Sequence, residues 1–182
     1  MQREEALELI KKHTTNQNLL KHMIAVEAIM VDLSDFFKED RQTWALAGLL
    51  HDIDFEMTKD NHEKHGILAC EILRNRVSQE VLDIIKSHNE KTGFKAESRA
   101  QKSLIAADAV SGLIIAAALI MPSKKLKDVK PESLKEKFKK KDFARAVSRE
   151  HMMICEELGL PLDKFLELSL NALQKVSDQL GL

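Results

Sequence analysis

The stretch LAGLLHDIDFE, residues 46–56, ends an apolar helical run with one histidine and three acids within six residues. An unpaired charge is costly to bury, so acids that a hydrophobic helix carries toward the core need partners or a cation. His51 and Asp52 project about 100° apart on a helix, so both can reach one ion only at a helix end. Asp54 and the acidic residues around it predict that the helix does end here. The cluster therefore predicts further ligands elsewhere in the chain.

Length and composition favour one globular domain. A chain of 182 residues can bury a substantial core. The formal net charge of −1 gives no general attraction to nucleic acid or to an anionic membrane. Cys70 and Cys155, far apart in amphipathic patterns, are typical of buried free thiols. Residues 1–13 are charged and contain no apolar signal-peptide core, so a cytoplasmic location is expected.

One apolar segment is long enough to span a membrane, SLIAADAVSGLIIAAALIM at residues 103–121. Asp108 lies inside it, and a carboxylate near the centre of a bilayer costs about 2.5–3.5 kcal/mol. The other helices of the chain have amphipathic patterns. The segment is therefore expected to be a buried central helix that stops at Pro122, and no membrane partner is expected.

Almost the whole chain has helical patterning, with three prolines, six glycines and no sustained period-two alternation. The expected helices are 3–13, Asn16 or Asn18 to about 37, one that carries Trp44 to Leu50 into His51 and Asp52, 65–74, Ser78 to about 88, the apolar helix before Pro122, 143–158 and 163–180. Residues 54–62 are expected to form a loop, and the lysine-rich residues 122–142 a connector or an exposed helix. The prediction is a single all-α domain over 1–182, a bundle of eight or nine helices. Its core covers about 16–122, and the C-terminal helices of 123–182 pack on it.

Two further ionisable residues occupy positions where apolar residues are expected. His22 lies on the apolar side of its helix, and Asp108 is flanked by alanines and valine in the most apolar helix. Taken singly, His22 fits a hydrogen-bonded core histidine, and Asp108 fits a helix cap or the partner of a lysine. Together with His51 and Asp52 they form a plausible nitrogen–oxygen ligand set for a divalent transition metal. A cation would also offset the burial of both carboxylates.

This order of residues resembles the HD superfamily of metal-dependent phosphohydrolases. A histidine is followed by a His-Asp doublet at a helix end and then by a distant aspartate, here in "LAGLLHDID" and "AADAV". The resemblance covers about residues 16–115. It implies an HD-like helical bundle in which His22, His51, Asp52 and Asp108 hold a divalent metal ion. Iron, manganese, cobalt, nickel and zinc all suit such ligands.

The resemblance extends to the HDIG-type members, which carry two more histidines for a second ion. "HGILACEIL" places His65 on the first of them, and "IIKSHNE" places His88 on the second. In two-metal members the aspartate of the doublet bridges the ions. Both histidines also fit surface positions at helix ends, and His62 is an alternative ligand or substrate contact. Whether one or two ions bind depends on whether His65 and His88 converge on Asp52.

The chain departs from the HDIG pattern at three places. Asp54 and Phe55 replace the glycine and lysine of "HDIGK", which removes the usual phosphate contact. Asn89 replaces the second histidine of "HHE", which argues against a third ion. The GYP signature of the cyclic-dinucleotide phosphodiesterases is absent, which argues against that activity.

Further residues are candidates for catalysis and substrate binding. Asp54 or Glu56 would orient the attacking water or move its proton, although both also fit loop solvation or helix capping. Lys59, Lys124 and Arg149 are the candidates for binding a substrate phosphate. The remaining lysines of 124–141 fit a solvated face.

The function expected from these features is hydrolysis of a small phosphate ester, possibly a nucleotide, by metal-activated water. One alternative is a non-catalytic metal-binding regulatory or interaction module. Another is a di-iron oxygenase on the same scaffold. The chain contains no tyrosine, and aromatic residues make up 4% of it, so no nucleic-acid polymer is expected as a partner. A homodimer is compatible with the sequence.

Overall fold

The structure, a computed structural model, describes all residues 1–182 and contains helices but no strands. The expected all-α fold is therefore confirmed, with ten α-helices in place of the expected eight or nine. Short 3-10 turns cover Phe55–Met57, His62–Lys64, Glu90–Thr92 and Leu126–Asp128. The α-helices are α1 (Arg3–His13), α2 (Gln17–Phe37), α3 (Arg41–Leu50), α4 (Ile67–Leu73), α5 (Gln79–Ser87), α6 (Arg99–Leu119), α7 (Pro131–Lys139), α8 (Arg149–Glu157), α9 (Leu162–Lys175) and α10 (Ser177–Leu180).

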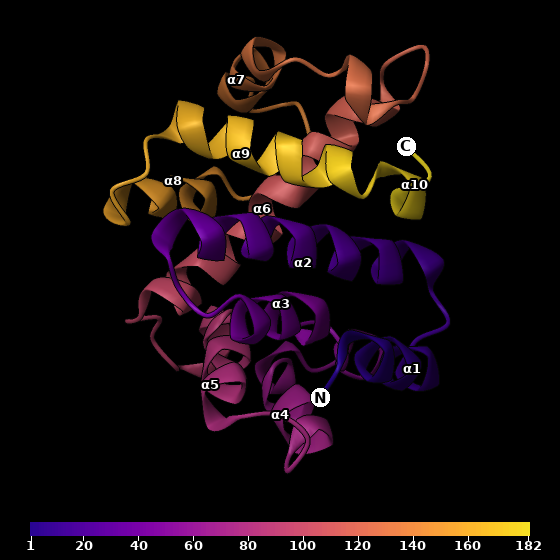
Figure 1. The fold of residues 1–182 in the computed structure, drawn as a ribbon, viewed down its shortest axis with the longest axis vertical. Helices are drawn as coiled ribbons and strands as arrows, with labels where there is room; N and C mark the ends of the chain where they lie inside the picture. Colours follow the sequence, from indigo (N-terminus) through magenta and orange to yellow (C-terminus); the bar gives the residue numbers. More distant parts are fainter.

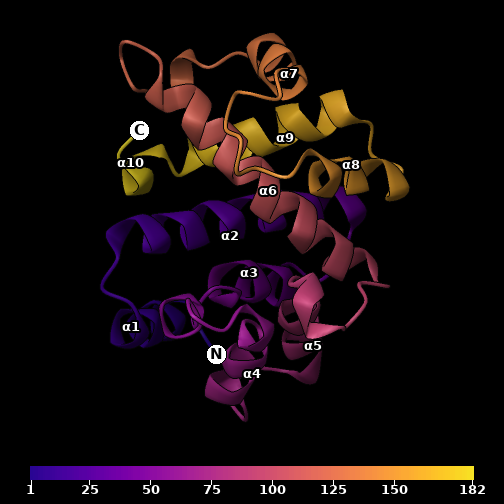
Figure 2. The same ribbon diagram turned by 180° about the vertical axis from the view of Figure 1, so that it is seen from behind.

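Helix α2 lies in the middle of the molecule, with α3 along one side and α9 along the other (Figure 1). Helix α6 runs diagonally across α2 and α9, as the view from behind shows (Figure 2). Helices α4 and α5 lie at one end of the molecule and α7 at the opposite end. In this arrangement, α2, α3, α5 and α6 all border the same part of the interior.

Five helices begin at a side chain that accepts hydrogen bonds from backbone N–H groups of the first turn. Such caps satisfy donors that have no partner within the helix. The caps are Asn16 for α2, Asp40 for α3, Ser78 for α5, Ser98 for α6 and Ser148 for α8. The sequence left Asn16 and Asn18 open as the cap of α2, and Asn16 is the one that caps it.

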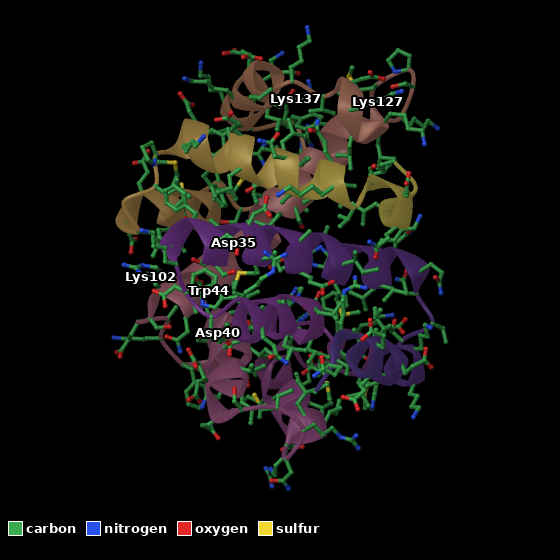
Figure 3. The ribbon with its side chains drawn as sticks, in the orientation of Figure 1. Asp35, Asp40, Trp44, Lys102, Lys127 and Lys137 are labelled. Atoms are coloured by element: carbon green, nitrogen blue, oxygen red, sulfur yellow. The ribbon has the colours of Figure 1, made fainter.

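Helices α2 and α3 form an antiparallel pair with a close crossing. A Cβ atom on Gly48 would lie 3.0 Å from the Glu27 Cα and from the Val26 carbonyl oxygen, so a larger residue would push the two helices apart by a few tenths of an ångström. Trp44 is 2% exposed and lies between the two helices (Figure 3). The pairing places the end of α3 beside the beginning of α2, where His22 lies.

Two predicted helix starts were wrong, each for a local backbone reason. The helix expected from His65 begins at Ile67, because Gly66 has a φ of 87° and His65 is extended. The helix expected from Phe143 begins at Arg149, because a turn with Ala144 at a φ of 47° precedes its Ser148 cap. Neither interruption changes the apolar periodicity, so the helical pattern gave no signal of it.

The last predicted helix, 163–180, is two helices. Helix α9 ends at Lys175, Val176 leaves the helical conformation with ψ at 15°, and α10 follows. The lysine-rich stretch forms a 3-10 turn and α7, and Pro131 occupies the first turn of α7, where its missing N–H has no partner to lose.

Helix α6 is long and apolar enough to cross a membrane by length and composition alone. In the fold it is a central helix, and 61% of its apolar window is buried inside the protein. This packing agrees with the expected buried helix around Asp108.

Candidate metal centre

Six side chains from separate parts of the chain meet in one region. His22 lies on α2, Asp108 lies on α6, and His88 directly follows α5. Helix α3 ends at Leu50, so the His51–Asp52 doublet lies in the turn after it, as the sequence pattern predicted. The sixth residue is His65, which precedes α4.

The first group consists of His22, His51 and Asp108. The Asp108 Oδ1 atom lies 3.1 Å from His22 Nε2 and 4.0 Å from His51 Nε2. Ligands that surround a transition metal at 2.0–2.2 Å are separated by about 3–3.5 Å. The group is therefore close to the spacing that an ion requires.

The second group consists of Asp52, His65 and His88. The Asp52 Oδ1 atom lies 3.2 Å from His65 Nε2 and 3.7 Å from His88 Nε2. Asp52 also faces the first group, with its Oδ2 3.6 Å from His22 Nε2 and its Oδ1 3.4 Å from His51 Nε2. Asp52 thus lies between two groups, the arrangement on which two-ion binding depends.

Backbone carbonyls fix the ring orientation of two of these histidines. His51 donates its Nδ1–H to the Gly48 carbonyl at 2.8 Å, and His88 donates its Nδ1–H to the Ile85 carbonyl. A carbonyl only accepts, so the proton must be on Nδ1 in both rings. Each neutral ring then directs its Nε2 lone pair into the centre.

The other two histidines have the same orientation but side-chain partners. The Ser111 hydroxyl donates to the Asp108 carbonyl at 2.8 Å and so accepts from His22 Nδ1–H at 3.2 Å. His65 donates its Nδ1–H to Asp54 Oδ1 at 2.8 Å. Partners that hold the outer nitrogen in this way are the usual support of histidines that bind metal ions.

The inward-facing nitrogens are not all paired: those of His22 and His65 lie 3.1 and 3.2 Å from a carboxylate, whereas His51 Nε2 has no such partner. His51 Nε2 is buried and makes no hydrogen bond. The Nε2 atoms of His65 and His88 lie 3.0 Å apart, and two lone pairs at this distance repel. A proton or a metal cation between them removes the conflict, so the donor set fits divalent ions.

Burial and charge act against each other on the ionisable groups of the centre. Burial favours the neutral acid, yet the neighbouring histidines hold the pKa of Asp52 well below its usual range and lower that of Asp108. Burial lowers the pKa of His51 to about 4. For His22 and His65, burial is outweighed by the carboxylates they contact, which raise the pKa to about 9 and about 10.

Metal binding is expected to release protons and to strengthen as the pH rises toward 9. At pH 7 the metal-free protein carries protons on His22 and His65, since their pKa values lie above 7, and ions must displace both. Each displaced proton makes the affinity rise about tenfold per pH unit. Calorimetric titration with Zn²⁺ in two buffers of different protonation enthalpy measures the release. Equal heats in both buffers would contradict the expectation.

The centre opens into a pocket of about 390 Å³. Its lining contains no lysine or arginine and combines the ligands with an amide and two apolar side chains. Phe55 is 37% exposed at the rim, with its ring edge-on to His65. The lining residues are Leu19, His22, Asp52, Phe55, His65, His88, Asn89 and Asp108.

A roomier groove between α1, α2, α3 and α9 also contains acids, but each of them has a cationic partner. Its volume is about 450 Å³. No acid in it requires a metal ion. The pairs are Glu27 with Arg3 at 2.7 Å, Asp32 with Lys175 at 2.7 Å and Asp35 with Arg41 at 2.6 Å.

The structure does not place the two acids expected to act on water in the pocket lining. Asp54 is fully buried, and its carboxylate accepts from His65 and from the backbone N–H groups of Gly66 and Ala69. Glu56 accepts from the backbone N–H of Thr15 at 3.0 Å. Asp54 therefore supports the candidate ligand His65 and caps the beginning of α4. Helix capping was the alternative role that the sequence left open for it.

The three expected phosphate-binding cations also lie outside the pocket lining. Lys59 is exposed, with its amine 3.8 Å from Glu56. Lys124 lies beyond the end of α6, about 16 Å or more along the helix axis from Asp108. Figure 3 shows the lysine-rich end, marked by Lys127 and Lys137, opposite α4 and α5.

The guanidinium of Arg149 is bound by backbone carbonyls instead of facing the pocket. It donates to six of them in the turn that precedes α8 and at the end of α7. The Arg149 side chain thus holds in place the turn before α8, which the helical pattern did not predict. The carbonyls belong to Lys137, Phe138, Lys140, Phe143, Ala144 and Val147.

Arg149→Met is expected to lower the free energy of unfolding by about 2–3 kcal/mol, because carbonyls lose a charged donor. The melting temperature should fall by roughly 4–12 °C for a chain of this size. Thermal denaturation followed by circular dichroism checks this. Arg145→Met, at an exposed residue without such contacts, should change stability by about 0.5 kcal/mol or less. An Arg149→Met protein as stable as the Arg145→Met protein would contradict the structural role.

Two supporting residues were not predicted from the sequence. Ser111 follows Asp108 by three residues on α6, so a buried serine one turn from a candidate ligand was the available signal. The Asn89 side chain donates to the carbonyls of His62 and His65 at 2.7 and 3.0 Å, and this pairing had no signal in the sequence. The side chain of His62 is exposed and belongs to neither ligand group.

Comparison with known proteins agrees with this geometry. A tRNA (cytidine(56)-2'-O)-methyltransferase of Picrophilus torridus is 27% identical over 86 residues, which cover 47% of this chain and 25% of that protein. No solved structure matches the chain significantly. The family model of the HD domain matches residues 19–113, just over half of the chain, and this range includes all six residues of the two groups. The chain therefore belongs to the HD domain family.

Proposed function

We propose that this protein is a metal-dependent phosphohydrolase that acts on a small phosphate ester with two divalent ions. The observation that carries the proposal is the position of Asp52 between two groups of ligands that open into one pocket. Paired ions in such sites serve phosphoryl transfer to water in many hydrolases. The proposal rests on this arrangement and on membership of the HD domain family.

When bound, divalent ions supply Lewis acidity: they lower the pKa of water and neutralise charge on a phosphate. The protein's own groups prepare the site for this chemistry. Gly48, Ser111 and Ile85 hold three ring N–H groups so that the opposite nitrogens face inward. Asp52 and Asp108 keep their negative charge despite burial, because their pKa values are lowered.

The pocket lining favours a substrate with a single phosphate group. None of its eight residues is a lysine or arginine, so the protein supplies no cationic side chain there for a chain of phosphates. Leu19 and Phe55 give the rim an apolar side that would contact the organic part of the ester. A phosphomonoester or phosphodiester of an apolar or aromatic alcohol fits these features best.

The test is turnover of p-nitrophenyl phosphate and bis(p-nitrophenyl) phosphate by protein loaded with Mn²⁺ alone. Release of nitrophenol by the loaded protein, lost after chelation and restored by Mn²⁺, is the expected result. Asp108→Asn should reduce turnover to background. Asp128→Asn, which changes an exposed acid near α7, should leave it unchanged.

Two other outcomes would overturn the proposal. A protein that binds two ions but cleaves neither ester would favour the non-catalytic metal-binding module. The same ligands also suit a pair of iron ions. Consumption of dioxygen by iron-loaded protein without phosphate release would favour the oxygenase.

A further inference from the structure

The supports of the four histidines differ in one respect that bears on the two ion sites. Three of the supports are neutral: the carbonyls of Gly48 and Ile85 and the hydroxyl of Ser111. The fourth, the Asp54 carboxylate on His65, is ionic. A hydrogen bond to a carboxylate is stronger than one to a neutral oxygen and makes the opposite ring nitrogen a better electron-pair donor. Only the second ligand group, Asp52, His65 and His88, therefore contains a histidine with a charged support.

Both carboxylate oxygens of Asp54 are already occupied by hydrogen bonds, so neither is free to act on a water molecule or a substrate. Its side chain is fully buried, and its Oδ2 accepts from the N–H groups of Gly66 and Ala69 at 2.8 and 2.9 Å. The positive φ of Gly66 turns the chain so that its N–H reaches this oxygen. Only Oδ1 remains for His65, at 2.8 Å. The carboxylate therefore fixes the ring and the beginning of α4 as one unit.

We propose that Asp54 is a positioning residue for the second ion: it orients His65 and raises the donor strength of its Nε2, so that this ion binds next to Asp52. The inference rests on the proposed two-ion function. It assigns to Asp54 a role in metal binding through His65 and no contact with substrate.

An asparagine at position 54 would disrupt this arrangement without a change of size. Its single carbonyl oxygen cannot accept from His65 and from both backbone N–H groups at once. With the oxygen on Gly66 and Ala69, its amide NH₂ would face His65 Nδ1, which must then accept. The ring proton then favours Nε2, and the nitrogen that faces Asp52 becomes a weaker ligand for an ion.

The experiment titrates Co²⁺ into metal-free wild type, Asp54→Asn, His65→Ala and Thr58→Val, with calorimetry and visible absorption as readouts. Wild type should bind two ions, and His65→Ala one. Asp54→Asn should bind the first ion as wild type does and the second 10- to 100-fold more weakly, the usual effect of removing such a support. The first ion serves as the internal control for correct folding.

Thr58→Val separates the effect of the Asp54 carboxylate on the ring from loosening of the loop. The Thr58 hydroxyl donates to the backbone carbonyl of Asp54 at 3.0 Å, and Thr58 does not line the pocket. If Asp54 acts on the ring through its carboxylate, Thr58→Val should retain two ions of nearly wild-type affinity. Equal second-ion affinities in Asp54→Asn and wild type would overturn the inference, and so would equal losses in Asp54→Asn and Thr58→Val. A wild type that binds no Co²⁺ would overturn the proposed function itself.

A measurement on the wild type covers the case in which Asp54→Asn does not fold. In ¹⁵N-labelled protein loaded with Zn²⁺, four ring Nδ1–H protons should be protected from solvent exchange. The proton of His65, which alone has a charged acceptor, should lie furthest downfield and disappear in His65→Ala. Four similar chemical shifts would overturn the inference.

Discussion

Asp52→Asn is expected to reduce the bound metal from two ions per chain to at most one and turnover by about 1000-fold or more. The carboxylate lies within 3.7 Å of all four histidine Nε2 atoms, so its charge acts on both groups. A 1000-fold loss corresponds to about 4 kcal/mol of transition-state stabilisation, within the range that a metal ion supplies. Elemental analysis of purified protein, with ester turnover on the same samples, measures both effects.

Asp60→Asn is the matched control for this substitution. Asp60 is an exposed acid in the same loop region and forms no ion pair, so metal content and turnover should stay at wild-type values. An Asp52→Asn protein that keeps two ions would show that the bridging position of Asp52 is not needed. Loss of metal in Asp60→Asn as well would mean that any charge change in this region disturbs the centre.

Metal binding is expected to raise the melting temperature by roughly 8–16 °C for each ion. A ligand at about 1000 times its dissociation constant stabilises the native state by about 4 kcal/mol, and each kcal/mol is worth about 2–4 °C in a chain of this size. The physical source is the cluster of inward-facing lone pairs and carboxylates, which the ions neutralise. Differential scanning calorimetry of chelated and Zn²⁺-loaded protein gives the shift.

Calcium provides the comparison for specificity. Ca²⁺ prefers six to eight oxygen ligands, whereas this centre offers four imidazole nitrogens and two carboxylates. The shift with Ca²⁺ should therefore be much smaller than with Zn²⁺. Identical melting temperatures for chelated and Zn²⁺-loaded protein would contradict the presence of a metal site.

Four of the six candidate ligands could be predicted because each breaks a local pattern, whereas His65 and His88 were placed only by the resemblance to HDIG-type proteins. His22 and Asp108 interrupt apolar helix faces, and the doublet at 51–52 ends an apolar run, so the cost of burial alone marks them. The end of α3 was predictable for the same reason. Hydrophobic patterning also predicted the all-α fold, because nearly every segment carries a helical stripe.

The supporting contacts of Asp54 and Asn89 could not be predicted because they join residues that are distant in sequence. The carboxylate of Asp54 accepts from Ala69, 15 residues away, and the Asn89 amide reaches back 24 residues to His65. For Arg149 the reason is different: its charge suggested an anion site, but its partners are backbone carbonyls of the preceding turn and of α7, which have no signal in the sequence. A charged side chain in a sequence indicates only that it needs a partner, and the tertiary fold decides which one.

The supports of His51 and His88 are both carbonyls three residues earlier, at Gly48 and Ile85. Each of these helix ends carries its ligand together with the group that orients it, within four consecutive residues. Such a segment can be transferred as a unit. Grafted onto the end of a buried helix in another bundle, it would carry the imidazole together with the carbonyl that orients it. His22 and His65 lack this property, since their partners come from α6 and from the turn after α3. The ends of α3 and α5 are therefore the parts of this centre that could be rebuilt in an unrelated protein with the fewest transferred residues.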